Sequence, residues 1–132
     1  MKFENKFQTA SSDFKKFIVD TPNLIFRGRV VYVNKLGELL NLASGSTRTD
    51  LKLIITPKME KEAPWLVDFL AILSLMERNI ILEFIETNKD ADSEILSTAI
   101  NEGITVVSND KFRQKRYHKL MSCGIPILTL RN

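Results

Sequence analysis

Three aspartates each follow a predicted strand, at the point where the chain turns toward a helix. Asp20 comes directly after one short apolar run, and Asp92 and Asp110 each come a few residues after another. Because the carboxyl ends of parallel strands meet along one edge of a sheet, these side chains are expected to gather there. Carboxylate oxygens suit Mg²⁺, and a group of carboxylates repels itself unless a cation binds. The pattern therefore favours metal-dependent hydrolysis.

A second interpretation of the same aspartates needs no ligand. An aspartate between a strand and a helix is often the N-cap of that helix, where it accepts a backbone N–H and stabilises the helix by about 1 kcal/mol. The sequence does not exclude this interpretation for any of the three aspartates.

The residue counts exclude several other kinds of chemistry. The chain has 132 residues, 44% of them hydrophobic, with one Cys and one His. One Cys excludes a disulfide framework and a zinc site built from cysteines, and one His excludes a nuclease that uses two imidazoles as acid and base. Catalysis by this chain would depend on carboxylates or hydroxyls, within about one domain.

Short β-branched runs alternate with helical patterns along the chain. Strands are predicted at residues 17–19, 51–56, 80–85, 104–107 and 127–130. Helices are predicted around residues 36–43, 66–76 and 95–100. A final helix is predicted from Lys111 through the apolar Tyr117, Leu120 and Met121, ending near Gly124. This alternation predicts an α/β fold of three layers, with a central, mostly parallel five-stranded sheet and helices on both faces. Residues 17–132 form this domain, and residues 1–16 are a polar arm or an extra helix.

Charge is distributed unevenly along the chain. Residues 59–102 carry ten acids and three bases, whereas residues 111–132 carry six bases and no acid. This asymmetry suggests a polyanionic partner held beside a negatively charged centre, although a solvated basic helix face explains the basic tail equally well. The bases that could meet phosphates are Lys111, Arg113, Lys115, Arg116 and Lys119 on the predicted final helix, and Arg27 and Arg29 after the first turn.

Several aromatic and sulfur side chains are expected in the core. Phe112 and Tyr117 could stack on a base, but core packing is the favoured interpretation. Trp65 and Met76 belong to an apolar helical pattern, and Cys123 is expected to be a small packed residue.

Three segments resemble a known nuclease site. Residues 17–24 (FIVDTPNL) resemble the opening strand and Asp-x-x-Asn turn of the NYN subclass of PIN-like nucleases. Residues 92–95 (DSEI) and 103–110 (GITVVSND) resemble the second half of that site. Within the subclass, residues 108–113 (SNDKFR) are most similar to the regnase-type (MCPIP-type) endoribonucleases. The resemblance covers residues 17–130, most of the chain.

The resemblance implies a Rossmann-like PIN fold and a metal-dependent endoribonuclease. Such an enzyme uses Mg²⁺ or Mn²⁺, cuts single-stranded or loop RNA and leaves 5′-phosphate and 3′-hydroxyl ends. By matched positions, the catalytic residues would be Asp20, Asn23, Asp92 and Asp110, and the metal ligands would be Asp20, Asp92 and Asp110. Asp90, one residue before the family's position, is a candidate fourth metal ligand. The supporting residues would be Thr21, Ser108 and Asn109, with Asp68 as a candidate extra acid. RNA would contact Arg27, Lys111, Arg113 and Arg116.

The sequence departs from the family pattern at two positions. Ala91 stands where regnase-type sites carry the first of two adjacent aspartates, and Thr21 stands where the NYN turn usually has Gly. The missing carboxylate supports an alternative function, a catalytically weak PIN-like module that binds RNA or a protein. A nucleotide-binding Rossmann domain ranks third, because residues 20–23 lack a phosphate-cradling glycine.

The expected location is intracellular and cytoplasmic, with the nucleus also open. The apolar runs are far shorter than the ~20 residues that span a membrane, and the opening MKFENKF has no apolar signal-peptide stretch. RNA, single-stranded or in a stem-loop, is the expected partner. No membrane association is expected, and a homodimer is a possible assembly.

Overall fold

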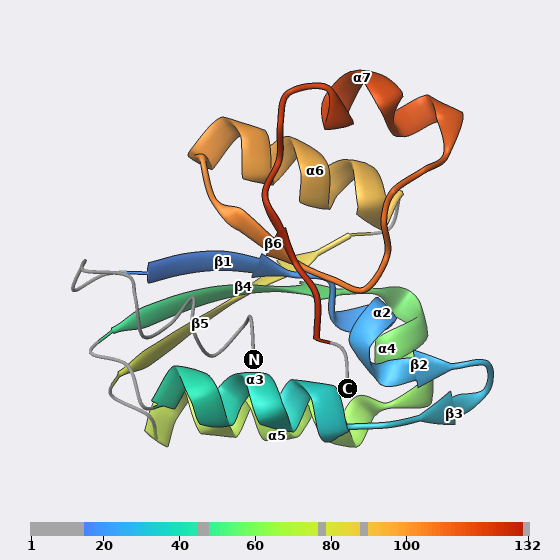
Figure 1. Cartoon of the computed structure of the whole chain (residues 1–132). Coiled ribbons are helices and arrows are strands. Elements are labelled where there is room, and N and C mark those ends of the chain that lie inside the picture. Colours follow the sequence, from blue (N-terminus) through green and yellow to red (C-terminus); the bar gives the residue numbers. More distant parts are fainter. Residues whose placement is uncertain (1–14, 45–47, 77–78, 88–89, 131–132) are drawn as a thin grey trace.

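A five-stranded, all-parallel sheet forms the centre of the molecule (Figure 1). The structure is a computed structural model and describes residues 15–44, 48–76, 79–87 and 90–130. The strands are β1 (Lys15–Val19), β4 (Thr49–Ile55), β5 (Ile80–Glu86), β6 (Thr105–Val107) and β7 (Ile127–Leu128). The predicted α/β class with a parallel five-stranded sheet is confirmed.

Helices cover both faces of this sheet. On one face lie α3 (Asn34–Ser44) and α5 (Pro64–Met76), and on the other lie α6 (Ala91–Glu102) and α7 (His118–Met121) (Figure 1). The smaller elements are α2 (Thr21–Ile25), α4 (Pro57–Glu62), the strands β2 (Phe26–Arg27) and β3 (Val30–Val31), and the 3₁₀ turn η1 (Lys115–Tyr117). The arrangement has the three layers that the sequence predicts.

The strand order places a reversal of direction beside β1. The order across the sheet is β5-β4-β1-β6-β7, so the chain first builds outward from β1 through β4 to β5. Helix α6 then carries it back across the sheet to β6, on the other side of β1. In sheets of this kind, ligands bind beyond the carboxyl ends of the strands at such a reversal. The fold therefore favours a ligand in the space after β1 and β6.

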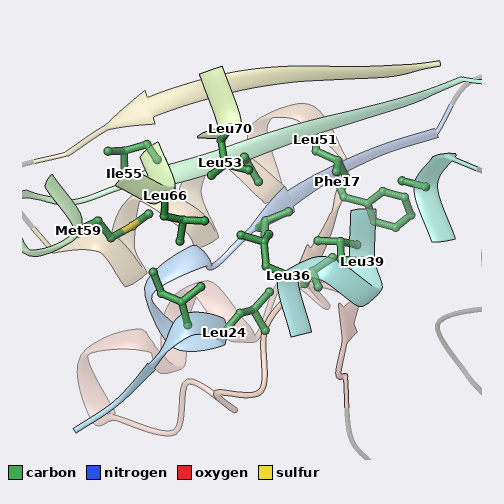
Figure 2. Close-up of a cluster of buried hydrophobic side chains, with 14 of the residues drawn as sticks. Phe17, Leu24, Leu36, Leu39, Leu51, Leu53, Ile55, Met59, Leu66 and Leu70 are labelled. Atoms are coloured by element: carbon green, nitrogen blue, oxygen red, sulfur yellow. The ribbon is translucent and has the colours of Figure 1, made fainter. Parts of the chain in front are cut away.

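The larger core lies between the sheet and the α3–α5 layer. Successive strand residues point to opposite faces, so Phe17 and Val19 pack on this side while Ile18 packs on the other. Leu51 and Leu53 of β4 join the same cluster (Figure 2). The remaining members that Figure 2 labels are Leu24, Leu36, Leu39, Ile55, Met59, Leu66 and Leu70.

A second core lies under α6. Ile18 and Ile54 from the strands pack there with Ile95 of the helix. Phe112 and Tyr117 close this cluster, each only 1% exposed, with their rings edge to face at a centroid distance of 6.4 Å. The favoured interpretation of these two aromatics as core residues is confirmed.

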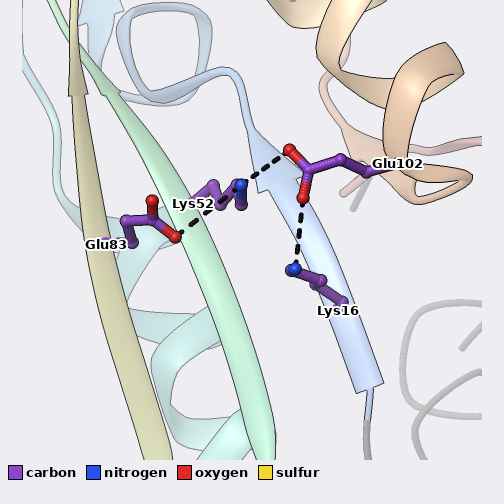
Figure 3. A network of polar contacts seen from close by, with 4 residues as sticks. All are labelled: Lys16, Lys52, Glu83 and Glu102. Atoms are coloured by element: carbon purple, nitrogen blue, oxygen red, sulfur yellow. Dashed lines mark hydrogen bonds and ion pairs between the residues drawn. The ribbon is translucent and has the colours of Figure 1, made fainter.

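A polar network holds the carboxyl end of α6 against the strands (Figure 3). Lys52 of β4 donates to Glu102 at 2.6 Å and lies 3.7 Å from Glu83, while Lys16 of β1 reaches the other Glu102 oxygen at 3.1 Å. The hydrogen bond from Lys52 is the main reason why the pKa of Glu102 lies below its ordinary value. The network therefore fixes α6 across two neighbouring strands.

The segment after Asp110 differs from the predicted helix. Phe112 has a left-handed backbone with φ 51°, and residues 111–114 are not helical. Lys111 and Arg113 therefore lie on a loop, and Arg116 lies in η1. The helical pattern failed here because a left-handed residue cannot be accommodated inside an α-helix. The predicted end near Gly124 agrees with α7, and Gly124 has φ 76°.

Helix α5 exposes side chains that the sequence assigned to the core. Trp65 and Met76 are 55% and 72% exposed, because Leu66 and Leu70 occupy the side of the helix that faces the sheet. The helix is apolar on two sides, and only one of them can be buried against the strands. The core prediction for Trp65 and Met76 is therefore wrong. The prediction for Cys123 is wrong as well, since its side chain is exposed.

The sequence pattern did not predict α4, α2 or the β2–β3 hairpin, because these elements are too short to show a hydrophobic period. Helix α4 has Thr56 as its N-cap, with the hydroxyl accepting from the Met59 N–H at 3.3 Å, and Pro57 starts the helix. Pro64 then starts α5, which separates the two helices. Helix α2 has five residues, and the β2–β3 hairpin turns at Gly28, whose φ is 62°.

The predicted N-terminal arm falls mostly on residues 1–14, which lie outside the described residues. Strand β1 begins at Lys15, two residues before the predicted start at Phe17. Among the described residues, no helix is both long enough and apolar enough to cross a membrane.

The network around Lys52 gives a stability prediction. Glu102→Gln should lower the free energy of unfolding by about 1 kcal/mol at pH 7, because it removes the charge that pairs with two lysines. The pKa of Glu102 is lowered in the folded state, so the stabilisation is present above its ordinary value and is lost as the pH falls through the folded value. Denaturant unfolding should show a larger difference at pH 7 than at pH 3.

Glu83→Gln is the matched control. Its carboxylate lies 3.7 Å from Lys52 and its side chain is 60% exposed, so the loss should be smaller than that of Glu102→Gln. An equal or larger loss for Glu83→Gln would contradict the assignment of Glu102 as the centre of the network.

Candidate metal centre

Three aspartates converge at the carboxyl edge of the sheet. One carboxylate oxygen each from Asp20, Asp92 and Asp110 lies within 4.8 Å of the other two. Asp20 follows β1, Asp92 lies in the first turn of α6, and Asp110 comes three residues after the end of β6. We call these three residues the carboxylate cluster. It lies beside the reversal in strand order, where the fold favours a ligand.

Asp20 is the buried member of the cluster. Its residue is 4% exposed, and its backbone N–H donates to the Val107 carbonyl at 2.9 Å, which ties the end of β1 to β6. Asp20 stands at the N-cap of α2, but its side chain makes no capping hydrogen bond. Instead, its Oδ2 accepts from the Ser108 hydroxyl at 2.7 Å. Ser108 is therefore the main partner of the Asp20 side chain, while the nearby backbone N–H of Asn23 also lowers the pKa of Asp20.

Ser108 connects two members of the cluster. The residue is completely buried, and its Oγ donates to Asp20 while accepting from the Asp110 backbone N–H at 3.0 Å. A hydroxyl has one proton to donate and lone pairs to accept, so a single group serves both contacts. Ser108 thereby sets the position of Asp110 relative to Asp20.

A pair of asparagines fixes the turn beside Ser108. The Asn23 amide oxygen accepts from the Asn109 backbone N–H at 2.9 Å. The Asn109 side chain in turn bonds both backbone groups of Leu130, accepting from its N–H at 2.8 Å and donating to its carbonyl at 3.2 Å. The two asparagines hold the loop after β6 against α2 and the last segment of the chain.

Asp110 lies on a strained loop. Its Oδ1 accepts from the Phe112 backbone N–H at 2.9 Å, and Phe112 is the one non-glycine residue with positive φ among the described residues. A bulky residue rarely adopts this conformation unless its surroundings hold it there, and Phe112 is buried under α6. Burial of the ring thus helps to hold the loop that carries Asp110.

Asp90, which was predicted to be a fourth metal ligand, instead caps α6. It is the N-cap of α6, accepting from the Asp92 N–H at 3.1 Å, and the Tyr117 hydroxyl donates to its carboxylate at 2.7 Å. Arg116 lies 3.7 Å from its other oxygen. Burial would raise the pKa of Asp90, but these contacts outweigh it and lower the pKa. The structure does not bring Asp90 into the carboxylate cluster, and Asp90 rather than Asp92 caps α6.

The cluster carries an electrostatic cost. Burial raises the pKa of Asp20 to about 6, with the Ser108 hydrogen bond acting against it and the negative charges of Asp92 and Asp110 adding to it. The pKa of Asp92 is also raised, by burial and then by the charges of Asp110 and Asp90. The ionised carboxylates oppose one another, and a cation between them would relieve that repulsion.

The donor set fits a hard divalent cation. The cluster offers three carboxylate oxygens near one another, which suits Mg²⁺ or Mn²⁺, and Mg²⁺ usually keeps some of its waters beside one or two carboxylates. Asp20, Asp92 and Asp110 are the residues that would hold the ion.

The other predicted site residues lie in varied positions. The Thr21 hydroxyl is buried and donates to the Val19 carbonyl at 3.3 Å, so it is directed at the end of β1. Asp68 is exposed on α5 and is not part of the carboxylate cluster. The Arg116 guanidinium lies 4.8 Å from the Tyr117 ring centre, and its charge lowers the pKa of Asp92.

The remaining three RNA-contact candidates are exposed. Lys111 and Arg113 follow Asp110 on the loop, and the Arg113 carbonyl lies 3.2 Å from His118 Nε2. Arg27 lies on β2, with its guanidinium 5.1 Å from the Tyr32 ring centre.

Sequence reasoning missed two features of this region. The first is the hydrogen bond from Tyr117 to Asp90, which joins residues 27 positions apart and has no local signal. The second is a cavity between Arg27, Tyr32 and α3, formed by the β2–β3 hairpin. The short runs on either side of Gly28 were the available signal for that hairpin.

No protein-family model and no curated protein matches this chain. The geometry and chemistry of the site therefore carry the functional assignment.

The raised pKa of Asp20 gives a stability prediction. Asp20→Asn should raise the free energy of unfolding in EDTA at pH 8 by on the order of 2 kcal/mol, because the buried charge is removed. The folded-state pKa exceeds the unfolded one, so protonation stabilises the wild type at low pH, and that stability is lost as the pH rises through about 6. Melts from pH 8 to pH 4 should show the advantage of Asp20→Asn shrinking toward low pH.

Asp90→Asn is the control with the opposite sign. The pKa of Asp90 is lowered, so its charge stabilises the fold at pH 8 and Asp90→Asn should destabilise it. Two variants that change stability in the same direction at pH 8 would contradict the electrostatic assignment.

Proposed function

We propose that the protein is a metal-dependent endoribonuclease of the PIN-like type, in the NYN subclass and nearest to the regnase-type enzymes. It hydrolyses phosphodiester bonds of single-stranded or loop RNA at the carboxylate cluster. The observation that carries the proposal is the convergence of Asp20, Asp92 and Asp110 within 4.8 Å at the strand reversal. These are the residues that the resemblance matches to the family's metal-site carboxylates.

The three aspartates hold Mg²⁺ or Mn²⁺ in this proposal. The ion supplies charge neutralisation at the phosphate and a bound water of lowered pKa. Asp20 is the ligand set deepest in the fold, and Ser108 orients it through its hydroxyl. Asp110 is positioned by the same hydroxyl, and Asn23 supports the turn between them.

Positive side chains lie close to this centre along the chain. Lys111 and Arg113 directly follow Asp110 and are exposed, so they can meet phosphates on either side of the cut. Arg116 acts electrostatically on Asp92. Each phosphate contact on a single strand should add about 0.7 to the slope of log affinity against log salt. Because these bases belong to the acid-free tail, they offset the charge of the carboxylate cluster for a polyanion.

A second candidate function is an RNA-binding module without efficient cleavage. Ala91 supplies no carboxylate, and Asp90 is engaged by Tyr117 and Arg116. Three carboxylates then remain to bind the ion, which lowers the expected metal affinity. The exposed bases Lys111 and Arg113 would still bind RNA. An intracellular setting, in the cytoplasm or the nucleus, suits either function because both act on RNA.

RNA cleavage tests the proposal. Purified protein should cut single-stranded and hairpin RNA with Mn²⁺ or Mg²⁺ and not with EDTA, as followed on denaturing gels. Asp92→Asn and Asp110→Asn should each reduce the rate by roughly a hundredfold or more, because each removes a charged group from the reacting centre.

Asp50→Asn is the matched control and should leave the rate unchanged. Asp50 lies near the amino end of β4, away from the carboxyl edge, and pairs weakly with Arg48 at 3.5 Å. Cleavage that persists in EDTA or in Asp92→Asn would overturn the metal mechanism. Tight RNA binding with no cleavage by the wild type would establish the second candidate instead.

A further inference from the structure

A cavity of about 200 Å³ lies between α2, the β2–β3 hairpin and the start of α3. Its lining residues are Leu24, Arg27, Tyr32, Asn34, Lys35 and Glu38. The members of the carboxylate cluster are not among them. Four of the six side chains are charged or aromatic, so the cavity offers convergent polar groups beside an aromatic ring, as ligand sites do.

The cavity combines positive charge with an aromatic surface. The Arg27 guanidinium lies 5.1 Å from the centre of the Tyr32 ring, and Tyr32 is 42% exposed. Lys35 is 8% exposed although it is charged, in the first turn of α3, where the helix dipole is also positive. Phosphate suits the two cations, and both aromatic rings and guanidinium planes accept a stacked base.

The cavity is close to the carboxylate cluster along the chain and in space. Leu24, one of its walls, donates its N–H to the Asp20 carbonyl at 3.2 Å, within a single turn of about 6 Å in rise. Figure 1 shows α2 and the hairpin at the end of the sheet to which β1 and β4 point. The cavity therefore lies within reach of a strand of RNA bound at the cluster.

We propose that this cavity binds one nucleotide of single-stranded RNA beside the cleavage position, which rests on the proposed function. Arg27 and Lys35 hold its phosphate, and Tyr32 stacks on its base. Glu38 and Asn34 offer a carboxylate and an amide to the polar edge of the base, which gives the cavity a means of preferring one base over another.

Two measurements test the cavity. In ¹H–¹⁵N NMR spectra of the full chain in EDTA, each of the four nucleoside 5′-monophosphates is titrated in turn. The amides of Leu24, Tyr32 and Lys35 should shift for at least one of them. In cleavage assays, Tyr32→Ala and Arg27→Ala should raise KM by about tenfold with little change in kcat, and Tyr32→Phe should restore the wild-type KM. Arg48→Ala is the control, because Arg48 is an exposed cation beside the amino end of β4. This variant should change neither KM nor kcat.

The outcomes separate this proposal from the proposed function. Cleavage with an unchanged KM in both variants and no amide shifts would overturn the cavity and leave the nuclease in place. Shifts at these amides in a protein that cuts no RNA would overturn the nuclease and support the nucleotide cavity.

A different observation carries a second inference, on α5. Trp65, Phe69, Ile72 and Met76 recur at spacings of four, three and four, and all are more than half exposed. We call these four residues the α5 seam. The spacing matches the a and d positions through which two helices pack side by side. The sheet-facing residues Leu66 and Leu70 lie on another side of the helix.

The size of the seam suits a second copy of the chain. With the neighbouring Leu75, 87% exposed, the seam presents on the order of 600 Å² of apolar surface, at the upper end for a monomer. Two copies would bury roughly twice that area, which reaches the lower range of stable interfaces. We infer that the protein forms a homodimer through two facing α5 helices, since each copy supplies an identical uncharged seam.

Sedimentation and fluorescence test the dimer. Multi-angle scattering and sedimentation equilibrium of the full chain should give a dimer at micromolar concentration. Emission of Trp65, the single tryptophan, should move to longer wavelength on dilution. Phe69→Glu should give a monomer with unchanged circular dichroism, whereas Val30→Glu, at an exposed apolar residue of the hairpin, should remain a dimer. A wild type that is monomeric at 100 micromolar, or a Phe69→Glu protein that stays dimeric, would overturn the inference.

Discussion

The hydrogen bond from Ser108 to Asp20 joins the carboxyl ends of β1 and β6, the two strands on either side of the reversal in strand order. Strand register pairs Val19 with Val107, so Asp20 and Ser108 are the next residues on adjacent strands and lie side by side. The same hydroxyl accepts from the Asp110 N–H. Since Ser108 is completely buried, it cannot exchange these partners for water without cost. A shift of one residue between β1 and β6 would separate Asp20 from Ser108 and remove the contact that orders the cluster.

The charges at the two ends of α6 are arranged in opposite ways. Near its amino end, Asp92 meets other carboxylates, and its pKa is raised. At its carboxyl end, Glu102 meets two lysines, and its pKa is lowered. A fold that only maximised its own stability would pair charges at both ends. The unfavourable end is the one that lies at the strand reversal, which is where a functional site is expected to depart from the stable arrangement.

The fold was largely predictable because each long element carried its own period. A strand such as β4 is a continuous apolar or alternating run, and a helix such as α6 is amphipathic over several turns. The parallel sheet follows from the alternation of such strands and helices. The three aspartates of the cluster were predictable for the same reason, since the ends of parallel strands must meet. Contacts between distant residues were not predictable. Tyr117 reaches Asp90 after a loop in which Phe112 is left-handed, and no local pattern marks either feature.

Helix α6 is fixed by side-chain contacts at both of its ends, so its length sets the distance between them. Asp92 in the carboxylate cluster and Glu102 on Lys16 and Lys52 are ten residues apart, a helical rise of about 15 Å. Both ends are anchored, and Gly103 with φ 65° stops the helix directly after Glu102. An inserted or deleted residue would turn one anchor by about 100° relative to the other. The length of α6 is therefore constrained from both sides, so evolutionary changes in chain length should accumulate in the loops around it.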